Sequence, residues 1–287
     1  WVSRVADVRS GDAATIAVRT AQKSSSDTVV LAPIADPASV AVAGNLAAQK
    51  GWALLLTTSD ALSTVTRTEL ARRTPTTVYA VGTPTDLPAA LVTDVGAMAG
   101  VGTVTRVTGT NATGVSVNAA KLLAPATGAV AVVVGETDLG SLAVGSGAAR
   151  AKKGPLLVVP GGAAPSTSVP AYLDTLAPKA TVVIGSTDAV ADTVAATLPK
   201  VSRLAGADAV DTASKAATWA GSASARVVVL GKALAPVSAV ALAPGAVVLV
   251  VDTSVASSTK VVLQRGVATV VAGPNMPDAL VTTARRL

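Results

Sequence analysis

The sequence predicts an α/β fold of three tandem repeats, each a small, mostly parallel sheet flanked by helices. Apolar runs rich in Val and Leu alternate with Ala-rich stretches along all 287 residues, and the pattern recurs three times. Aromatic residues make up only 2% of the chain while hydrophobic residues make up 50%, so the core must consist mainly of aliphatic side chains. Continuously apolar strands that alternate with helices are typical of parallel sheets covered on both faces.

Eleven apolar runs are predicted to be strands. They span residues 28–32, 53–57, 77–81, 103–107, 129–134, 155–159, 181–184, 201–204, 226–230, 246–251 and 267–271. Between them apolar residues recur at intervals of three and four, and a Ser, Thr or Asp opens the run, as in 61–73 and 188–198. This spacing predicts helices with capped N-termini.

Residues 233–251 carry no charge and reach the lower range of length for a transmembrane helix. Pro236, Pro244 and Gly245 interrupt this stretch, and it ends in a β-branched run. Because proline breaks a helix interior, we expect a short helix followed by a buried strand instead of a transmembrane segment. Charged residues near the beginning, such as Arg4, lead us to expect no signal peptide in this sequence.

Glycines that follow equivalent runs reveal a period near 100 residues. Gly51 and Gly154 are 103 residues apart, and so are Gly82 and Gly185. Gly273 follows Gly185 after 88 residues, so the third copy is shorter. The predicted repeats span residues 1–103, 104–200 and 201–287.

The later repeats open with the pattern Arg-x-x-Gly, which is formed by Arg106 and Gly109 in the second and by Arg203 and Gly206 in the third. An apolar strand, a small-residue helix, a Gly followed by a second apolar strand, and a final apolar strand ending in Gly come next. In this order the residues resemble the cell-wall-binding repeat (type 2) of Gram-positive bacteria, over almost the whole chain and in three copies.

The resemblance implies three modules packed around a pseudo-threefold axis, with an anionic wall polymer held between them. It also implies an extracytoplasmic protein held non-covalently on the cell wall or cell surface. The sequence departs from the family at the start of each first helix, where Ser39, Ser141 and Ser238 open the segments that begin with Asp-Ala-Leu in the family. Gly82 and Gly185 also stand singly where the family often has Gly-Gly.

The composition excludes several classes of chemistry. The chain has no His and no Cys, which excludes Ser-His-Asp and Cys-His nucleophiles and the usual zinc ligand sets. We therefore expect no catalysis, no cofactor and no metal site. The net charge of +6 favours an anionic partner, yet no basic run exceeds two residues and aromatics are sparse, so nucleic acid is not expected.

Ser39, Ser141 and Ser238 are candidate polymer-binding residues, because each comes eight or nine residues after an equivalent position within a predicted strand. A serine at a helix N-terminus can accept a backbone N–H, and the same terminus attracts anions. The alternative interpretation is an ordinary helix cap without a ligand.

Cations after the second helix of each repeat are a second candidate set, and Trp52 is a third. A cation at a helix C-terminus complements the helix dipole, and equivalent cations on three modules could also bind one polymer with avidity. Trp52 could stack on a sugar or serve only as a packing residue. The cations are Arg72, Arg73, Lys179 and Arg265.

We therefore predict a non-catalytic protein that binds or anchors non-covalently to an anionic cell-wall polymer. One alternative is a structural or accessory subunit of an envelope complex, with a protein as its partner. A second alternative is a small-molecule receptor that uses the crevice at the carboxyl ends of the strands.

Overall fold

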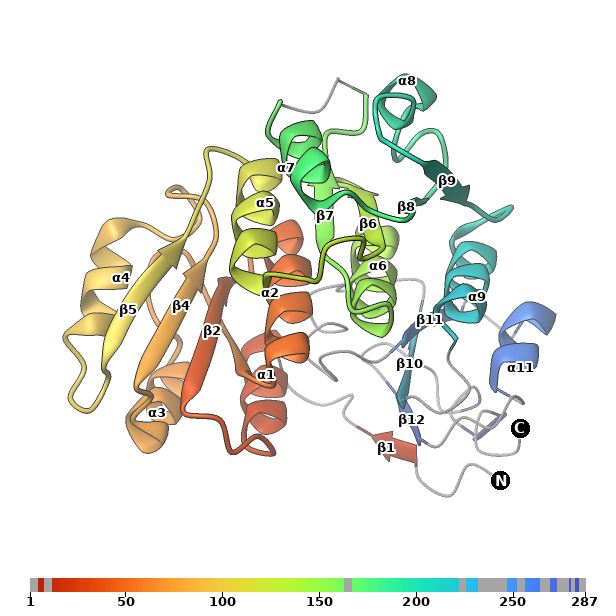
Figure 1. The fold of residues 1–287 in the computed structure, drawn as a ribbon. Coiled ribbons are helices and arrows are strands. Elements are labelled where there is room, and N and C mark those ends of the chain that lie inside the picture. The colour runs from red at the N-terminus through yellow and green to blue at the C-terminus, as the bar shows by residue number, and fades with distance from the viewer. Residues whose placement is uncertain are drawn as a thin grey trace.

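The computed structural model describes residues 5–7, 12–162, 167–221, 226–231, 247–251, 256–263 and 269–272, with 279, 282 and 283. The strands form three four-stranded sheets, and every strand pair within the described residues is parallel. In Figure 1 the first sheet lies at the left, the second at the top right and the third below the second. The predicted α/β fold of three small sheets is confirmed.

The first sheet has the strand order β3-β2-β4-β5. Its strands are β2 (Thr28–Pro33), β3 (Ala53–Thr57), β4 (Thr77–Val81) and β5 (Thr103–Val107). The helices in this part of the chain are α1 (Ala13–Ala21), α2 (Pro37–Lys50), α3 (Thr64–Arg73) and α4 (Ala89–Gly96). We call this sheet with its helices the first module.

The second module repeats this arrangement with the strand order β7-β6-β8-β9. Its strands are β6 (Ala131–Gly135), β7 (Leu156–Val159), β8 (Thr181–Ile184) and β9 (Val201–Leu204). Its helices are α5 (Ala112–Leu123), α6 (Leu139–Ala151), α7 (Ser168–Leu176) and α8 (Asp192–Ala195).

The third module has the order β1-β12-β10-β11, which is the same order read from the opposite edge. Its strands are β10 (Arg226–Gly231), β11 (Val247–Val251), β12 (Thr269–Ala272) and β1 (Val5–Asp7). Its described helices are α9 (Ala209–Ala220) and α11 (Ser257–Leu263). The fourth strand of this sheet therefore comes from the beginning of the chain.

The fourth strand of each sheet and the helix that follows it belong to different modules. β5 pairs with β4, whereas α5 packs on β7, and β9 pairs with β8, whereas α9 packs on β11. In the same way β1 pairs with β12, and α1 packs on β3. The strand that opens each predicted repeat thus completes the sheet of the preceding module, so sequence repeat and sheet are offset by one strand.

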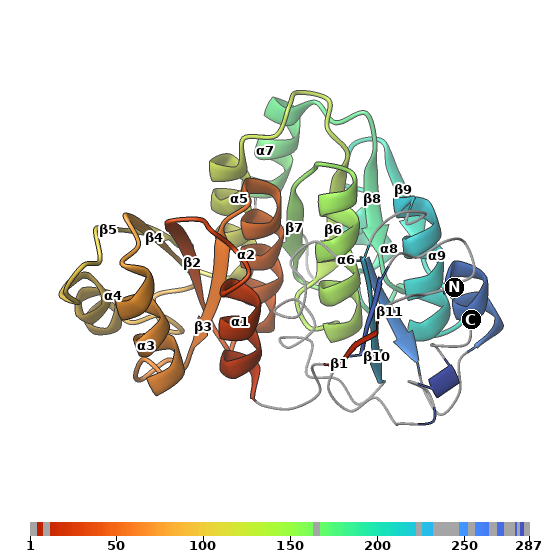
Figure 2. The ribbon, with the colours of Figure 1, turned by 90° about the horizontal axis from the view of Figure 1, so that it is seen from below.

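Helices α2 and α6 lie side by side between the sheets, with α5 and α9 next to them (Figure 2). Their fully buried residues, such as Leu46 and Leu142, share one aliphatic core with the inward-facing residues of the strands. Separate clusters fill the outer faces of the first and second sheets. Ala- and Gly-rich helix faces suit this position because they allow two helices and a sheet to approach closely.

All eleven predicted strands are present, and they differ from the predicted bounds by two residues at most. The predicted helix over 61–73 begins at Thr64, and only Asp192–Ala195 of the stretch 188–198 is helical. Within 233–251 the predicted strand is β11, while the predicted helix lies outside the described residues. No described helix has the length and apolar character needed to cross a membrane.

Candidate functional site

Basic side chains gather where α2 and α6 end. In β–α–β units the helices run antiparallel to the strands, so helix C-termini lie at the edge where strands begin. Lys50 is the last residue of α2, and Arg150, Lys152 and Lys153 come from the last turn of α6 and the two residues just after it. We call these four residues the basic junction, since they lie where the first and second modules meet.

A cavity of about 540 Å³ opens at the basic junction. It is lined by Ala48, Gln49, Arg150, Ala151 and Lys153, and none of these lining residues is acidic. Lys50, Arg150 and Lys153 are exposed, whereas Lys152 is half-buried. The two basic lining residues, Arg150 and Lys153, thus place positive charge at a solvent-accessible hollow.

The backbone at the ends of the two helices holds these cations in place. Gly51 ends α2 in the left-handed conformation, with φ of 72°, and Lys153 also has a positive φ of 53°. At Gly154 a Cβ atom would lie 1.9 Å from the carbonyl oxygen of Val130, so only glycine fits there. These turns bring the chain from each helix directly into the next strand, β3 or β7.

Polar contacts join α2 to α6 near the cavity. Gln49 Nε2 donates a hydrogen bond of 2.8 Å to the carbonyl oxygen of Gly154. Deeper between the helices, Ser146 Oγ donates to the Ala41 carbonyl at 3.0 Å, and Asn45 Nδ2 to the Ser146 carbonyl at 3.4 Å. Because the partners are 101 to 105 residues apart in sequence, these bonds fix the two modules relative to each other.

Aromatic rings flank the basic junction, and a lysine lies over each. Trp52 stacks on Tyr79 with ring centroids 4.8 Å apart, and Lys50 Nζ lies 5.9 Å from the Trp52 centroid. Lys152 Nζ lies 4.8 Å from the centroid of Trp219. Such cation–π contacts hold the ammonium groups near the ring faces. Trp52 is therefore held by packing on Tyr79, which supports the packing interpretation over sugar stacking.

The electrostatics of the basic junction favour an anion. The C-terminal ends of α2 and α6 carry partial negative charge that stabilises each cation by about 0.3–1 kcal/mol. Arg150 and Lys153 both line the cavity, and the positive charge of these side chains attracts an anion to it. Anion binding here should consequently stabilise the folded chain by mass action.

The alternative interpretation, in which serines cap these helices, is wrong for Ser39 and Ser141, because Asp36 and Asp138 are the N-caps. Asp36 accepts the Ala38 N–H, and Asp138 accepts the Ser141 N–H at 3.1 Å. Ser39 and Ser141 are buried and donate their hydroxyls to the carboxylates of Asp36 and Asp138. Each carboxylate accepts one of the free N–H groups at its helix N-terminus and repels an anion, so the geometry does not support polymer binding at Ser39 and Ser141.

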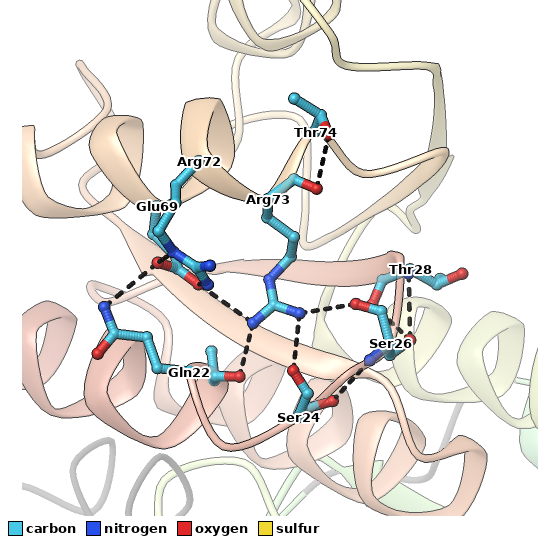
Figure 3. A network of polar contacts seen from close by, with 9 residues as sticks. Gln22, Ser24, Ser26, Thr28, Glu69, Arg72, Arg73 and Thr74 are labelled. Carbon is cyan, nitrogen blue, oxygen red and sulfur yellow. Dashed lines mark hydrogen bonds and ion pairs between the residues drawn. The ribbon is translucent and has the colours of Figure 1, made fainter.

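Arg72 and Arg73 lie in a network at the end of α3, and neither lines the cavity of the basic junction (Figure 3). Glu69, only 1% exposed, accepts hydrogen bonds from both arginines. Arg73, whose side chain is 6% exposed, also donates to the carbonyls of Ala21, Ser24 and Ser26. These hydrogen bonds hold α3 against the end of α1, so the role of Arg73 is structural.

The Glu69 carboxyl is held ionised by this network. Burial raises its pKa, but hydrogen bonds from Arg72, Gln22 and Arg73 and the charge of Arg72 lower it, and the net shift is downward.

Lys179 is exposed in the loop between α7 and β8, where its N–H donates to the Gly128 carbonyl. The structure does not bring it into the cavity of the basic junction. Ser238 and Arg265 lie outside the described residues. Among the predicted site residues that the structure describes, Trp52 is a neighbour of the basic junction, through Lys50.

Sequence reasoning missed the cations of the basic junction, although the pair Lys152 and Lys153 is visible in the sequence. A signal was present in the repeated pattern Lys-Gly before the second strand of the first two repeats, as in Lys50-Gly51 and Lys153-Gly154. The sequence spacing of these lysines does not show whether the ends of α2 and α6 lie side by side in the fold.

A second hollow, of about 290 Å³, lies at the carboxyl ends of the strands of the second sheet. It lies between β6 and β8, where the connections diverge, and this switch point is a common ligand position in α/β folds. Asp138, Asp188 and Asp208 are among its lining residues, so it is unsuited to an anion. Among the described residues no group of three or more carboxylates could hold a metal ion.

Searches with family models and against curated proteins find no match. Solved structures, by contrast, match the whole fold. The chain has the fold of Cwp6 and Cwp8 from Clostridium difficile. The TM-scores are 0.82 for Cwp6, at 18% sequence identity, and 0.83 for Cwp8, at 20% identity. Each match covers 98% of this chain, and the chain spans about half of the matched chains, 47% of Cwp6 and 51% of Cwp8.

Proposed function

We propose that the chain is a non-catalytic cell-wall-associated protein that binds an anionic wall polymer non-covalently at the basic junction. The observation that carries the proposal is the cavity between the first two modules, with Arg150 and Lys153 in its lining and no acidic lining residue. Cwp6 and Cwp8, which share the fold, are cell-wall proteins, and this supports a location at the cell wall or surface.

The chemistry of the basic junction suits a polymer with repeated negative charges. An exposed ion pair contributes only about 0.2–1 kcal/mol, so one anionic group would bind weakly. A polymer chain presents many such groups, and successive contacts with the same protein then become intramolecular. Several weak contacts can therefore hold the protein on the wall even though each individual contact breaks and re-forms.

Retention on purified Gram-positive cell wall tests this function. The full chain should sediment with native wall at low ionic strength, and retention should fall as salt screens the ion pairs. Wall from which the anionic polymers have been stripped should retain little protein. Equal retention on native and stripped wall would contradict the proposal, and retention that persists in high salt with one stoichiometric protein would favour an envelope-protein partner.

A small-molecule receptor is the second candidate, because the hollow at the carboxyl ends of the second sheet has the position of a ligand site. Its carboxylates and hydroxyls, including Asp188 and Ser186, fit a polar ligand that donates hydrogen bonds. Native mass spectrometry of the purified chain tests this candidate. A retained adduct that Asp188→Asn removes would support it, and a spectrum of the bare chain would count against it.

A further inference from the structure

A cavity of about 500 Å³ lies between α5 and α7, which are side by side in the second module (Figure 1). None of its described lining residues lines the cavity of the basic junction. Most of the lining is apolar, Tyr172 is part of it, and Lys121 is the one charged residue among the described lining residues. Small-molecule sites have volumes of about 300–1,000 Å³ and a similar lining, so this cavity has the size and character of a ligand site.

The first module has its arginine–glutamate network at the equivalent place, since α1 packs on α3 as α5 packs on α7. Thr74 and Ala177 follow α3 and α7 in the same left-handed conformation, with φ of 46° and 47°. Residues at the same distance before these two helix ends are therefore equivalent. The equivalent pairs are Glu69 and Tyr172, Arg72 and Thr175, and Arg73 and Leu176.

The replacements in the second module leave a crevice between its two helices. In the first module Arg73 reaches across to the carbonyl oxygen of Ala21 at 2.6 Å. Ala120 lies nine residues after the N-cap of its helix, as Ala21 does, and its carbonyl accepts the hydroxyl of Tyr172 instead. Thr175 and Leu176 are shorter than the arginines they replace. The ion network of the first module is thus exchanged for an apolar cavity with one hydroxyl donor.

The Tyr172 hydroxyl is a poorly satisfied donor. Its bond to the Ala120 carbonyl is 3.4 Å long, whereas bonds between a hydroxyl and an oxygen are usually about 2.5–3.0 Å. The residue is only 9% exposed, so water does not readily replace this partner. Burial also raises the pKa of Tyr172 to about 12, so the hydroxyl keeps its proton at neutral pH. A ligand oxygen at ordinary hydrogen-bond distance would satisfy the donor better.

We propose that this cavity binds a small molecule with an apolar body and one carboxylate. The apolar lining, which includes Ala171 and Leu176, contacts the body of the ligand. Lys121 pairs with the carboxylate, and the Tyr172 hydroxyl donates to one of its oxygens. No described lining residue is acidic, so the lining does not repel the anion. The site is separate from the basic junction, and the inference does not depend on polymer binding.

Ligand-observed NMR titration of the full-length chain tests the site with phenylbutyrate, and with its amide as the neutral counterpart. Phenylbutyrate should bind saturably, and the amide should bind more weakly. Lys121→Gln removes an exposed ion pair, so it should weaken phenylbutyrate about twofold to fivefold and leave the amide unchanged. Lys23→Gln removes an exposed cation just beyond α1 and should change neither. No saturable binding of phenylbutyrate, or an equal loss in both charge variants, would overturn the proposal.

Two variants within the cavity test where the probe binds. Ala171 is exposed on α7 and lines the cavity, so Ala171→Leu fills part of it without changing the core and should weaken both probes about tenfold. Tyr172→Phe keeps the ring and removes the donor, so it should weaken phenylbutyrate about twofold to tenfold. Circular dichroism should show the same fold in both variants. Phenylbutyrate binding that neither variant changes would place the probe elsewhere and contradict the proposed site.

Discussion

Gln49 and Gly154 join the first and second modules beside the basic junction, where the Gln49 side chain donates to the Gly154 carbonyl at 2.8 Å. The two residues also occupy equivalent regions of their repeats, just before and just after a Lys at the end of a central helix. This bond fixes one wall of the cavity relative to the other. The site is thus a product of the interface and belongs to neither module alone.

Replacing Gln49 with Ala should loosen this interface. The variant loses one part-buried hydrogen bond, so the free energy of unfolding should fall by about 0.5–1.5 kcal/mol. Chemical denaturation measures this change, and Gln22→Ala serves as a control at the α1–α3 network. If Gln49→Ala leaves both stability and wall retention unchanged, the hydrogen bond does not position the cavity.

Replacing Glu69 with Ala should destabilise the first module strongly. Arg73 would remain buried without a counter-charge, and breaking a buried ion pair in this way costs about 3–5 kcal/mol. Arg72→Gln is the matched control, because the Arg72 side chain is 55% exposed and such pairs contribute about 0–1 kcal/mol. Thermal unfolding that ranks the two variants equally would refute the structural role of the network.

Acid should weaken the same network. The pKa of Glu69 is lower in the folded state than its ordinary value, so its stabilisation is complete above that value and is lost as pH falls through the folded pKa. The free energy of unfolding should therefore fall less steeply from neutral to acidic pH in Glu69→Gln than in the unmodified chain. Parallel curves for the two proteins would contradict this assignment.

Alkaline pH should act on Tyr172 in the second module. Burial raises the pKa of its hydroxyl from 10.0 to about 12, so the folded state favours the neutral phenol. The stabilisation is complete below the unfolded pKa and is lost as pH rises toward the folded one. In Tyr172→Phe the free energy of unfolding should fall less steeply with rising pH. The same slope in the variant and the unmodified chain would show that the Tyr172 hydroxyl is solvated.

Helix capping distinguishes the aspartates from the predicted serines. Asp138→Ala removes the cap of α6 and should cost about 1 kcal/mol, within a range of 0.5–2. Ser141→Ala removes only a hydroxyl that donates to Asp138, so its cost should be smaller. Chemical denaturation of both variants measures their free energies of unfolding. A larger decrease for Ser141→Ala than for Asp138→Ala would contradict the assignment of Asp138 as the N-cap.

The central strands were predictable because they are continuous apolar runs, such as Val132 to Val134, which are fully buried. β1 was not predicted, since the three residues from Val5 to Asp7 carry one valine and a charge, and only pairing with the distant β12 makes them a strand. The Asp36-Pro37 pair, by contrast, was a readable signal for an N-cap followed by the first helical residue, and it was overlooked.

The site was harder to predict than the fold. Arg72 and Arg73 are adjacent in sequence, yet one is exposed and the other is buried against Ser24 and Ser26, 47 to 49 residues away. Likewise Gln49 and Lys153 line one cavity only because α2 packs on α6. Residue type and spacing do not encode such contacts.

Charge removal at the basic junction tests the central claim most directly. The variant Lys50→Gln, Lys152→Gln, Lys153→Gln is compared with the control Lys23→Gln, Arg67→Gln, Lys260→Gln, which removes the same charge from exposed sites outside the basic junction. Each lost ion pair weakens binding by about 0.2–1 kcal/mol, so three together should lower wall affinity about tenfold. The account predicts this loss for the junction variant alone, and an equal loss in both variants would contradict it.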